Sequence, residues 1–463
     1  MTALWTSDEI VAATGGVLEG APFEVTGVTF DSREVEAGDL FVAMPGSATD
    51  GHRFVAGAFA GGAAGALVSS SVDGPHVRVD DVAGALNDLA IAARARMAGI
   101  VIGVTGSVGK TSTKEALYAA LARFAPGKVH RSVKSYNNHT GVPLSLARMP
   151  RASDYAVLEM GMNRSGEIAA LTRLVRPHVA LITAIAAAHI EYLGSIEAIA
   201  DAKAEIFEGL EPDGTAILPE DTPLRDRLLK AARRHAKRIV TFGAGAADVS
   251  AVYAVRADNG GSLVTARLLD SDLTFSIAQR GDHWVTNALA LLATVEAVGA
   301  DLAIAGLALA DMAGLKGRGE RHRLSVDGGT CLLIDESYNA NPASMAATLQ
   351  ALGAERGVER RIAVLGPMRE LGAIGDTLHA ALAPAIVAAR VDHLILVGEE
   401  MDALVDALGG AVAVDQVADA GEAAARLSGL VRRGDAVLVK ASNSIGLARL
   451  VETMAVEHPS CST

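Results

Sequence analysis

A glycine-rich turn followed by a lysine and a threonine lies at residues 103–113, in the sequence G-V-T-G-S-V-G-K-T-S-T. An apolar run at 100–104 precedes it and a helix-like stretch at 111–121 follows it, which is the strand, turn and helix order of a phosphate-binding loop. In such a loop, backbone N–H groups surround phosphate oxygens, the lysine balances their charge and the hydroxyl holds magnesium. Lys110 and Thr111 fit these roles, although Val104 stands where the usual pattern has its first glycine.

A lysine on an apolar helix face is a second feature with chemical meaning. Segment 195–210 reads as a helix with Ser195 as its N-cap, and Lys203 falls on the face marked by Ile196, Ile199 and Ile206. Because burial penalises a charged amine, Lys203 must reach solvent, pair with an acid, or become neutral. A neutral amine can capture carbon dioxide as a carbamate, which would be a carboxylate-like metal ligand. The pattern alone leaves these alternatives open.

Two further polar residues follow apolar runs. Glu159 ends the run 154–159, and His189 ends the run 180–189. Ligands gather at the carboxyl ends of parallel strands, so a carboxylate and an imidazole there could hold magnesium, or could be structural.

The composition restricts the class of protein. A chain of 463 residues exceeds the size of one hydrophobic core, so several domains are expected. The net charge of −13 and the lack of basic runs argue against nucleic acid or an acidic membrane as partner. Cys331 and Cys461 are too few for a disulfide framework and suit a reducing cytosol. The N-terminus lacks a signal-peptide pattern and no apolar run reaches membrane-spanning length, so we expect a soluble, cytoplasmic protein.

The order of apolar runs predicts an α/β protein of three domains. Residues 1–98 read as a small α/β N-terminal module, and 99–322 as a P-loop-type ATPase domain built on a parallel sheet. The strand and helix alternation restarts after residue 322, so 323–463 is predicted to be a Rossmann-like domain.

Several ordered segments resemble the Mur ligases, ATP-dependent amide-forming enzymes of bacterial cell-wall precursor synthesis. That family carries T-G-x-x-G-K-T without the full loop spacing, which accounts for Val104. The segment D-E-S-Y-N-A-N-P at 335–342 looks like the branch that adds D-alanyl-D-alanine to a UDP-N-acetylmuramoyl-tripeptide. Further similar segments are S-Y-N-N-H-T-G-V-P-L at 135–144, E-M-G-M-N-R-S-G-E-I at 159–168, A-H-I-E-Y-L-G at 188–194, D-A-K-A-E-I-F-E-G-L at 201–210, V-L-G-P-M-R-E-L-G at 364–372, D-S-R at 31–33 and D-G-H-R-F at 50–54.

The resemblance implies roles for individual residues. Magnesium on ATP would be held by Thr111 and Glu159, and a second magnesium by His189 and a carbamylated Lys203. Residues implied in nucleotide binding are Thr105, Gly106, Ser107, Val108, Gly109, Lys110, Thr111, Ser112, Asn287, Arg318 and Asp335. Residues implied to face the UDP-sugar peptide in the N-terminal and central domains are Ser32, Asn137, Asn138 and Asn163. The domain layout implies closure around the substrates, and a monomer is expected.

Some features depart from the family or leave alternatives. Pro367 replaces a usual Asp and Asn443 a usual Arg, both in the domain implied to bind the dipeptide. The alternatives are a sister ligase that adds the third residue of the peptide, whose D-N-P-R motif is absent, and a catalytically silent nucleotide-binding protein. The third residue of the tripeptide stays open between diaminopimelate and lysine. His322 and His379 are candidates for a general base by residue type only.

Overall fold

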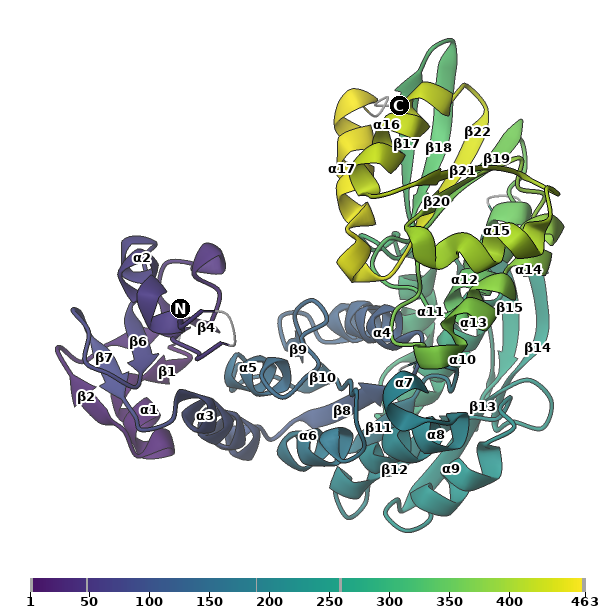
Figure 1. Cartoon of the computed structure of the whole chain (residues 1–463). Coiled ribbons are helices and arrows are strands. Elements are labelled where there is room, and N and C mark those ends of the chain that lie inside the picture. The colour runs from purple at the N-terminus through teal and green to yellow at the C-terminus, as the bar shows by residue number, and fades with distance from the viewer. Residues whose placement is uncertain (1–2, 47–48, 189, 258–259, 460–463) are drawn as a thin grey trace.

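Three large β-sheets and a two-stranded one organise the described residues, 3–46, 49–188, 190–257 and 260–459, of the computed structural model (Figure 1). Each large sheet is covered by helices, and the α/β class predicted from the sequence is confirmed. The predicted boundaries near residues 98 and 322 stay predictions; in the structure, the third sheet takes its first strand from Glu320. No helix among the described residues is long and apolar enough to cross a membrane.

The N-terminal module is built on five strands in the order β2-β7-β6-β5-β4. Its strands are parallel except for the antiparallel pair β2 and β7, and β1 pairs with β3 beside them. Its elements are β1 (Trp5–Thr6), α1 (Ser7–Thr14), β2 (Val17–Glu19), β3 (Glu24–Val25), β4 (Gly27–Thr29), β5 (Asp39–Val42), α2 (Val55–Ala60), β6 (Gly65–Val68), β7 (His76–Arg78) and α3 (Val82–Arg96). Asp81 caps α3 by accepting a hydrogen bond from the Ala83 N–H.

The central sheet has nine strands, and β8, which leads into the glycine loop, lies inside it between β11 and β10. Its elements are β8 (Ile100–Thr105), α4 (Lys110–Phe124), β9 (Val129–Arg131), α5 (Gly141–Ala147), β10 (Tyr155–Glu159), α6 (Glu167–Val175), β11 (Val179–Ile182), α7 (Ile190–Leu193), α8 (Ile196–Ala204), β12 (Thr215–Pro219), α9 (Arg225–Ala232), β13 (Arg238–Gly243), β14 (Val249–Arg256), β15 (Ser262–Arg267), β16 (Asp272–Ile277), α10 (His283–Ala297) and α11 (Leu302–Asp311). Glu159 pairs with Val104 across β10 and β8, so the register places Glu159 beside the start of the loop.

The expectation of a parallel sheet throughout this domain is wrong at one end. Strands β9 to β14 pair in parallel with their neighbours, but β15 and β16 are antiparallel. Short connections join β14 to β15 and β15 to β16, and parallel neighbours would need much longer crossovers. The predicted helix 195–210 also divides, because α8 ends at Ala204 and a 3-10 segment, Glu205–Gly209, follows it.

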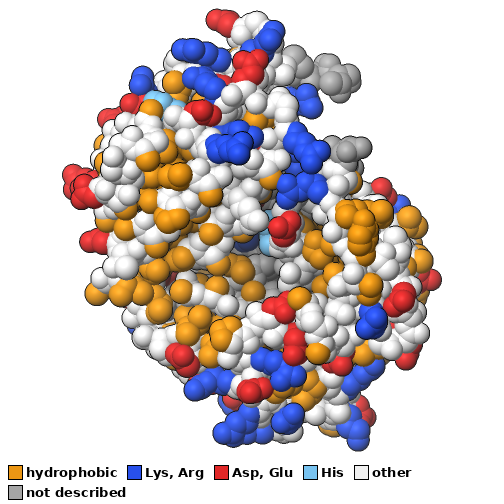
Figure 2. Space-filling view, turned by 90° about the vertical axis from the view of Figure 1, so that its right-hand side faces the viewer, with side chains coloured by type: hydrophobic (Ala, Val, Ile, Leu, Met, Phe, Trp, Pro, Cys, Tyr) orange, Lys and Arg blue, Asp and Glu red, His pale blue; other side chains and the backbone are white. Residues whose placement is uncertain are grey.

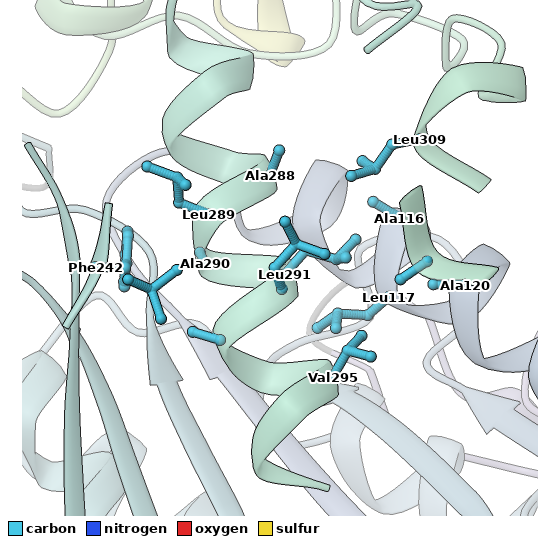
Figure 3. Packing of buried hydrophobic residues seen from close by; sticks show 14 of the residues in the cluster. Ala116, Leu117, Ala120, Phe242, Ala288, Leu289, Ala290, Leu291, Val295 and Leu309 are labelled. Carbon is cyan, nitrogen blue, oxygen red and sulfur yellow. The ribbon is translucent and has the colours of Figure 1, made fainter. Parts of the chain in front are cut away.

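Helices α4 and α10 share one buried core beneath the loop (Figure 3). Leu117 of α4 lies close to Leu291 and Val295 of α10 in this view, and all three side chains are buried. Because α4 begins at the glycine loop and α10 carries Asn287, this packing fixes the two functional segments relative to each other.

The third sheet has six strands in the order β17-β18-β22-β19-β20-β21, all parallel except the pair β17 and β18. Its elements are β17 (Glu320–Val326), β18 (Gly329–Asp335), α12 (Pro342–Gly353), β19 (Arg360–Leu365), α13 (Gly375–Ala380), α14 (Ala383–Ala388), β20 (His393–Val397), α15 (Asp402–Leu408), β21 (Ala413–Val417), α16 (Ala420–Leu430), β22 (Asp435–Lys440) and α17 (Leu447–Glu457). Asp335 and Lys440 therefore lie at strand ends, the edge where open parallel sheets bind ligands.

Candidate active site

The glycine loop depends on two glycines that no other residue could replace without a clash or strain. Gly106 has φ +149°, and a Cβ there would lie 2.0 Å from Thr183 Oγ1. Gly109 has φ +83°, and its Cβ would lie 3.0 Å from Asn287 Oδ1. Thr183 Oγ1 in turn donates a hydrogen bond to the Val108 carbonyl at 2.6 Å, so the end of β11 holds the loop in place.

The lysine of the loop folds back over it. Lys110 Nζ donates a hydrogen bond to the Gly106 carbonyl at 2.7 Å. Burial lowers the pKa of Lys110, while the charge of Glu159 opposes this shift. A phosphate group in the loop would provide the anion that such a lysine needs.

Thr111 and Glu159 form a hydroxyl and carboxylate pair at the start of α4. Thr111 Oγ1 donates to Glu159 Oε2 at 2.8 Å, and the Asn137 amide donates to Glu159 Oε1 at 2.7 Å. Glu159 is 1% exposed. Hard oxygen ligands of this kind, next to a phosphate-binding loop, fit a magnesium ion that also binds phosphate oxygens.

Lys203 of α8 is 1% exposed, as its position on the apolar face predicts. Its pKa is well below the usual range, chiefly because of burial and further because Lys110 is positively charged. Within the described ranges, its amine forms no hydrogen bond or ion pair. The charge of Glu205 opposes the lowering of this pKa, and the carbamate on Lys203 stays a prediction. His189, the other predicted ligand of this site, lies outside the described residues.

The loop opens into a cleft of about 710 Å³ between the central and third domains. Figure 2 shows a hollow near the middle of one face, with basic, acidic and histidine side chains at it. Residues predicted as functional that line the cleft are Ser107, Val108, Gly109, Lys110, Thr111, Ser112, Asn137, Glu159, Asn163, Asn287 and Arg318. The structure therefore brings together most of the site, from segments far apart in the sequence.

Arg318 lies just before β17, the first strand of the third sheet, and reaches a residue of the central domain. Its guanidinium carbon lies 4.1 Å from the centroid of the Tyr338 ring, and its Nη2 is 3.5 Å from Ser135 Oγ. Asp335 is not among the lining residues. Its two carboxylate oxygens accept hydrogen bonds from the backbone N–H groups of Gly317 and Ser337, at 2.9 and 3.0 Å. In this structure, Asp335 fixes the turn that carries Arg318, and its contact with a nucleotide stays a prediction.

The other predicted substrate residues differ in their surroundings. Asn138 Oδ1 accepts hydrogen bonds from the N–H groups of Thr140 and Gly141, so it caps the start of α5. Ser32 begins a 3-10 turn, Ser32–Glu34, in the N-terminal module. Thr105, which was predicted to bind the nucleotide, donates a hydrogen bond from Oγ1 to the Met160 carbonyl. Contacts of Ser32 and Asn138 with the sugar peptide stay predictions.

Several ionisable residues that line the cleft were missed from the sequence, among them Lys440, Glu336 and His283. Lys440 is 2% exposed, donates to the Asn339 carbonyl at 2.8 Å, and lies 3.6 Å from Glu336 Oε2. Burial lowers the pKa of Lys440 and raises that of Glu336. Burial also lowers the pKa of His283 to about 4. The signal for Lys440 was available, since it ends an apolar run as Glu159 does.

The two histidines considered as general bases are placed elsewhere. His379 Nε2 accepts a hydrogen bond from the Met368 N–H at 2.9 Å, and His322 lies 3.7 Å from Glu320. Neither is among the residues that line the cleft. Asn443, one of the two departures in the third domain, does line it.

Comparisons with known proteins give matches over nearly the whole chain. Residues 24–94 match the model described as Mur ligase family, catalytic domain; 104–295 match the Mur ligase middle domain; and 317–443 match Mur ligase, glutamate ligase domain. The UDP-N-acetylmuramoyl-tripeptide–D-alanyl-D-alanine ligase of Bacillus subtilis is 34% identical over 98% of this chain and 99% of its own length. That of Escherichia coli is 34% identical over 97% of this chain and 98% of its own.

Solved structures show the same fold. MurF from Acinetobacter baumannii superposes with a TM-score of 0.84 at 31% identity, covering 97% of this chain and 98% of its own. MurF ligase from Thermotoga maritima in complex with ADP superposes with a TM-score of 0.76 at 27% identity, covering 94% and 98%.

Proposed function

This chain belongs to the Mur ligase family, and we propose that it joins D-alanyl-D-alanine to UDP-N-acetylmuramoyl-tripeptide with cleavage of ATP to ADP and phosphate. One observation carries the proposal: the phosphate loop, the Thr111–Glu159 pair and Arg318 face one cleft between two domains. Relatives that carry the name of this reaction match nearly the full length of the chain.

The reaction needs an activated carboxylate, because a carboxylate is a poor electrophile. In the proposed sequence the terminal carboxylate of the tripeptide attacks the γ-phosphorus of ATP, and ADP leaves. The amine of the dipeptide then attacks the acyl phosphate, loses a proton, and displaces inorganic phosphate as the amide bond forms. The residues of this chain bind and orient the phosphates, which is most of what phosphoryl transfer requires of a protein.

Lys110 would neutralise charge on the transferred phosphoryl group, and Asn287 and Arg318 would bind the nucleotide. Thr111 and Glu159 would hold one magnesium ion, which supplies charge neutralisation between ATP phosphates when bound. The cleft formed by two domains supports closure over the reactants, since an acyl phosphate must be kept from water.

Lys203 is proposed to be carbamylated, with His189 as its partner at a second magnesium. The support is chemical: a fully buried amine with a strongly lowered pKa and no acceptor among the described residues is neutral and nucleophilic toward carbon dioxide. The resulting carbamate would give the lysine the anionic oxygen donors that magnesium prefers.

Ser32, Asn137, Asn138 and Asn163 are proposed to contact the UDP-sugar peptide, Ser32 from the N-terminal module and the three asparagines from the central domain. Because the co-substrate is ATP, we propose that the protein acts in the cytoplasm. We also propose that it acts as a monomer. A sister ligase acting on the dipeptide sugar is the alternative, and the departures at Pro367 and Asn443 make the third domain the part to test.

The experiment is magnesium-dependent phosphate release with each substrate omitted in turn and the product mass recorded, using tripeptides ending in diaminopimelate and in lysine. Release that needs both the tripeptide and D-alanyl-D-alanine, with a pentapeptide product, is expected. Release with the dipeptide sugar and a diamino acid would move the assignment to the sister enzyme. No release in any mixture would leave a nucleotide-binding protein.

A further inference from the structure

A short turn at residues 132–137 lies between the N-terminal module and the proposed metal ligands. It leads from β9 toward α5, and its successive side chains alternate in what they contact. Lys134 and Tyr136 contact the module, whereas Ser135 and Asn137 contact the Thr111–Glu159 pair. One turn of chain thus touches two sites that belong to different domains.

On the module side, the Lys134 ammonium forms an ion pair with the Glu34 carboxylate. The Tyr136 ring packs against Phe30, with 5.5 Å between the ring centroids. Glu34 belongs to the same 3-10 turn as Ser32, the residue proposed to contact the sugar nucleotide. A ligand that orders this turn also orders the partner of Lys134.

On the site side, Ser135 Oγ lies 3.1 Å from Thr111 Oγ1. The Asn137 side-chain amide donates to Glu159 Oε1 at 2.7 Å, and the Asn137 backbone carbonyl accepts the Gly161 N–H at 2.7 Å. The turn therefore orients both the hydroxyl and the carboxylate proposed to bind magnesium.

Lys114 of α4 holds the turn by hydrogen bonds to its backbone. It is 0% exposed, and its Nζ donates to the carbonyls of Ser132 at 2.8 Å and Lys134 at 2.6 Å. The same ammonium lies 2.9 Å from Glu115 Oε1. Lys134 is held at φ +53°, a left-handed conformation that a residue with a Cβ adopts only when its surroundings enforce it. Because the turn is anchored in one conformation, displacement of one face shifts the other.

We propose that this turn couples the two sites, so that binding of the UDP-sugar peptide to the N-terminal module tightens binding of magnesium nucleotide at the loop, and the reverse. The inference rests on the proposed function for the identity of both ligands. Lys114, Lys134 and Tyr136 are positioning residues in this scheme, since they act through Thr111 and Glu159. Linkage requires the coupling factor to be equal in the two directions.

The test is calorimetric titration of the full chain with ADP and magnesium, with and without saturating UDP-N-acetylmuramoyl-tripeptide. We expect the sugar peptide to tighten ADP binding about tenfold, equivalent to about 1.4 kcal/mol. In Lys134→Met and in Tyr136→Leu the factor should fall to about threefold, and in the double variant to within about twofold. Each ligand alone should keep its wild-type affinity within about twofold, since these side chains touch neither ligand in the proposed scheme.

Arg151→Met is the matched control. Arg151 forms an ion pair with Glu9 that also joins the central domain to the module, but neither residue touches the turn. This variant should keep the full coupling factor. Equal loss in Arg151→Met would show that general docking of the module, and not this turn, carries the effect, and would overturn the proposal.

The outcomes separate the coupling from the function. Binding of both ligands to the wild-type chain without any coupling, or full coupling in the double variant, would overturn the turn's role and leave the proposed function standing. Failure of the sugar peptide to bind at all would overturn the proposed function and the coupling with it.

Discussion

Replacing Lys203 with methionine should stabilise the protein while abolishing its activity. Methionine has a similar length and no charge, so it fills the same space without a buried amine. Lys203 is 1% exposed and has no acceptor within the described residues. A polar group buried without a hydrogen bond costs about 1–3 kcal/mol. We therefore expect the free energy of unfolding to rise by about 1–3 kcal/mol in Lys203→Met at pH 7, with magnesium removed by EDTA and bicarbonate depleted.

The stability difference between Lys203→Met and the wild-type protein should depend on pH in a definite direction. Because the pKa of Lys203 is lowered in the folded state, the unfolded chain binds more protons between the folded pKa and the ordinary value of 10.5. The wild-type protein therefore gains stability as pH rises through this window. The advantage of Lys203→Met should be largest near neutral pH and should shrink as pH approaches 10.5.

The assay is urea unfolding followed by circular dichroism at pH values from 7 to 10, with thermal melts in parallel. A stability gain of this size in a domain of this length corresponds to about 2–4 °C in Tm for each kcal/mol. Lys230→Met is the control, because Lys230 is an exposed lysine on α9 of the same domain and should change little.

Two results would refute the reasoning. A Lys203→Met variant that is less stable than wild type at pH 7 would mean that the amine has a strong partner in the folded state. A stability difference that stays constant with pH would mean that the lysine is not destabilised by burial. We expect Lys203→Met to lose phosphate release without losing stability, because Lys203 is needed for the reaction and not for folding.

Three other perturbations follow from the site and its surroundings. Gly106→Ala should abolish nucleotide binding and lower stability by more than about 2 kcal/mol, because its Cβ would lie 2.0 Å from Thr183 Oγ1; calorimetry with ADP and a urea melt check both. Glu159→Gln should lower phosphate release at least about 100-fold and raise the magnesium concentration needed for half-maximal activity, which a magnesium titration measures. Burial lowers the pKa of His130 from its ordinary value of 6.5 to about 4. The unfolded chain therefore binds more protons between these two values, and the folded protein loses stability as pH falls from 6.5 toward 4. His130→Gln should flatten that acid-side loss in melts at pH 4–7, and an unchanged slope would contradict the assignment.

The local chemistry of the site was predictable because each residue followed a recognisable element. The strand, loop and helix order placed Lys110 and Thr111, and strand ends placed Glu159. The antiparallel end of the central sheet was missed, because strand runs in sequence do not state the direction in which they pair. Asn138 and Asp335 also show the limit: their types suit ligand contact, yet in the structure both accept backbone hydrogen bonds that no spacing rule shows.

The two fully buried lysines of the central domain show why burial alone does not assign a role. Lys114 is 0% exposed, and four oxygens lie within 4.0 Å of its Nζ, so its positive charge is compensated and its task is to hold the turn behind Glu159. Lys203 is equally buried, and the charge of Lys110 lowers its pKa further, while the charge of Glu205 opposes this shift without cancelling it. A charged amine is stabilising at the first position and costly at the second. The same residue type therefore anchors a turn in one place and is expected to be neutral, and open to modification, in the other.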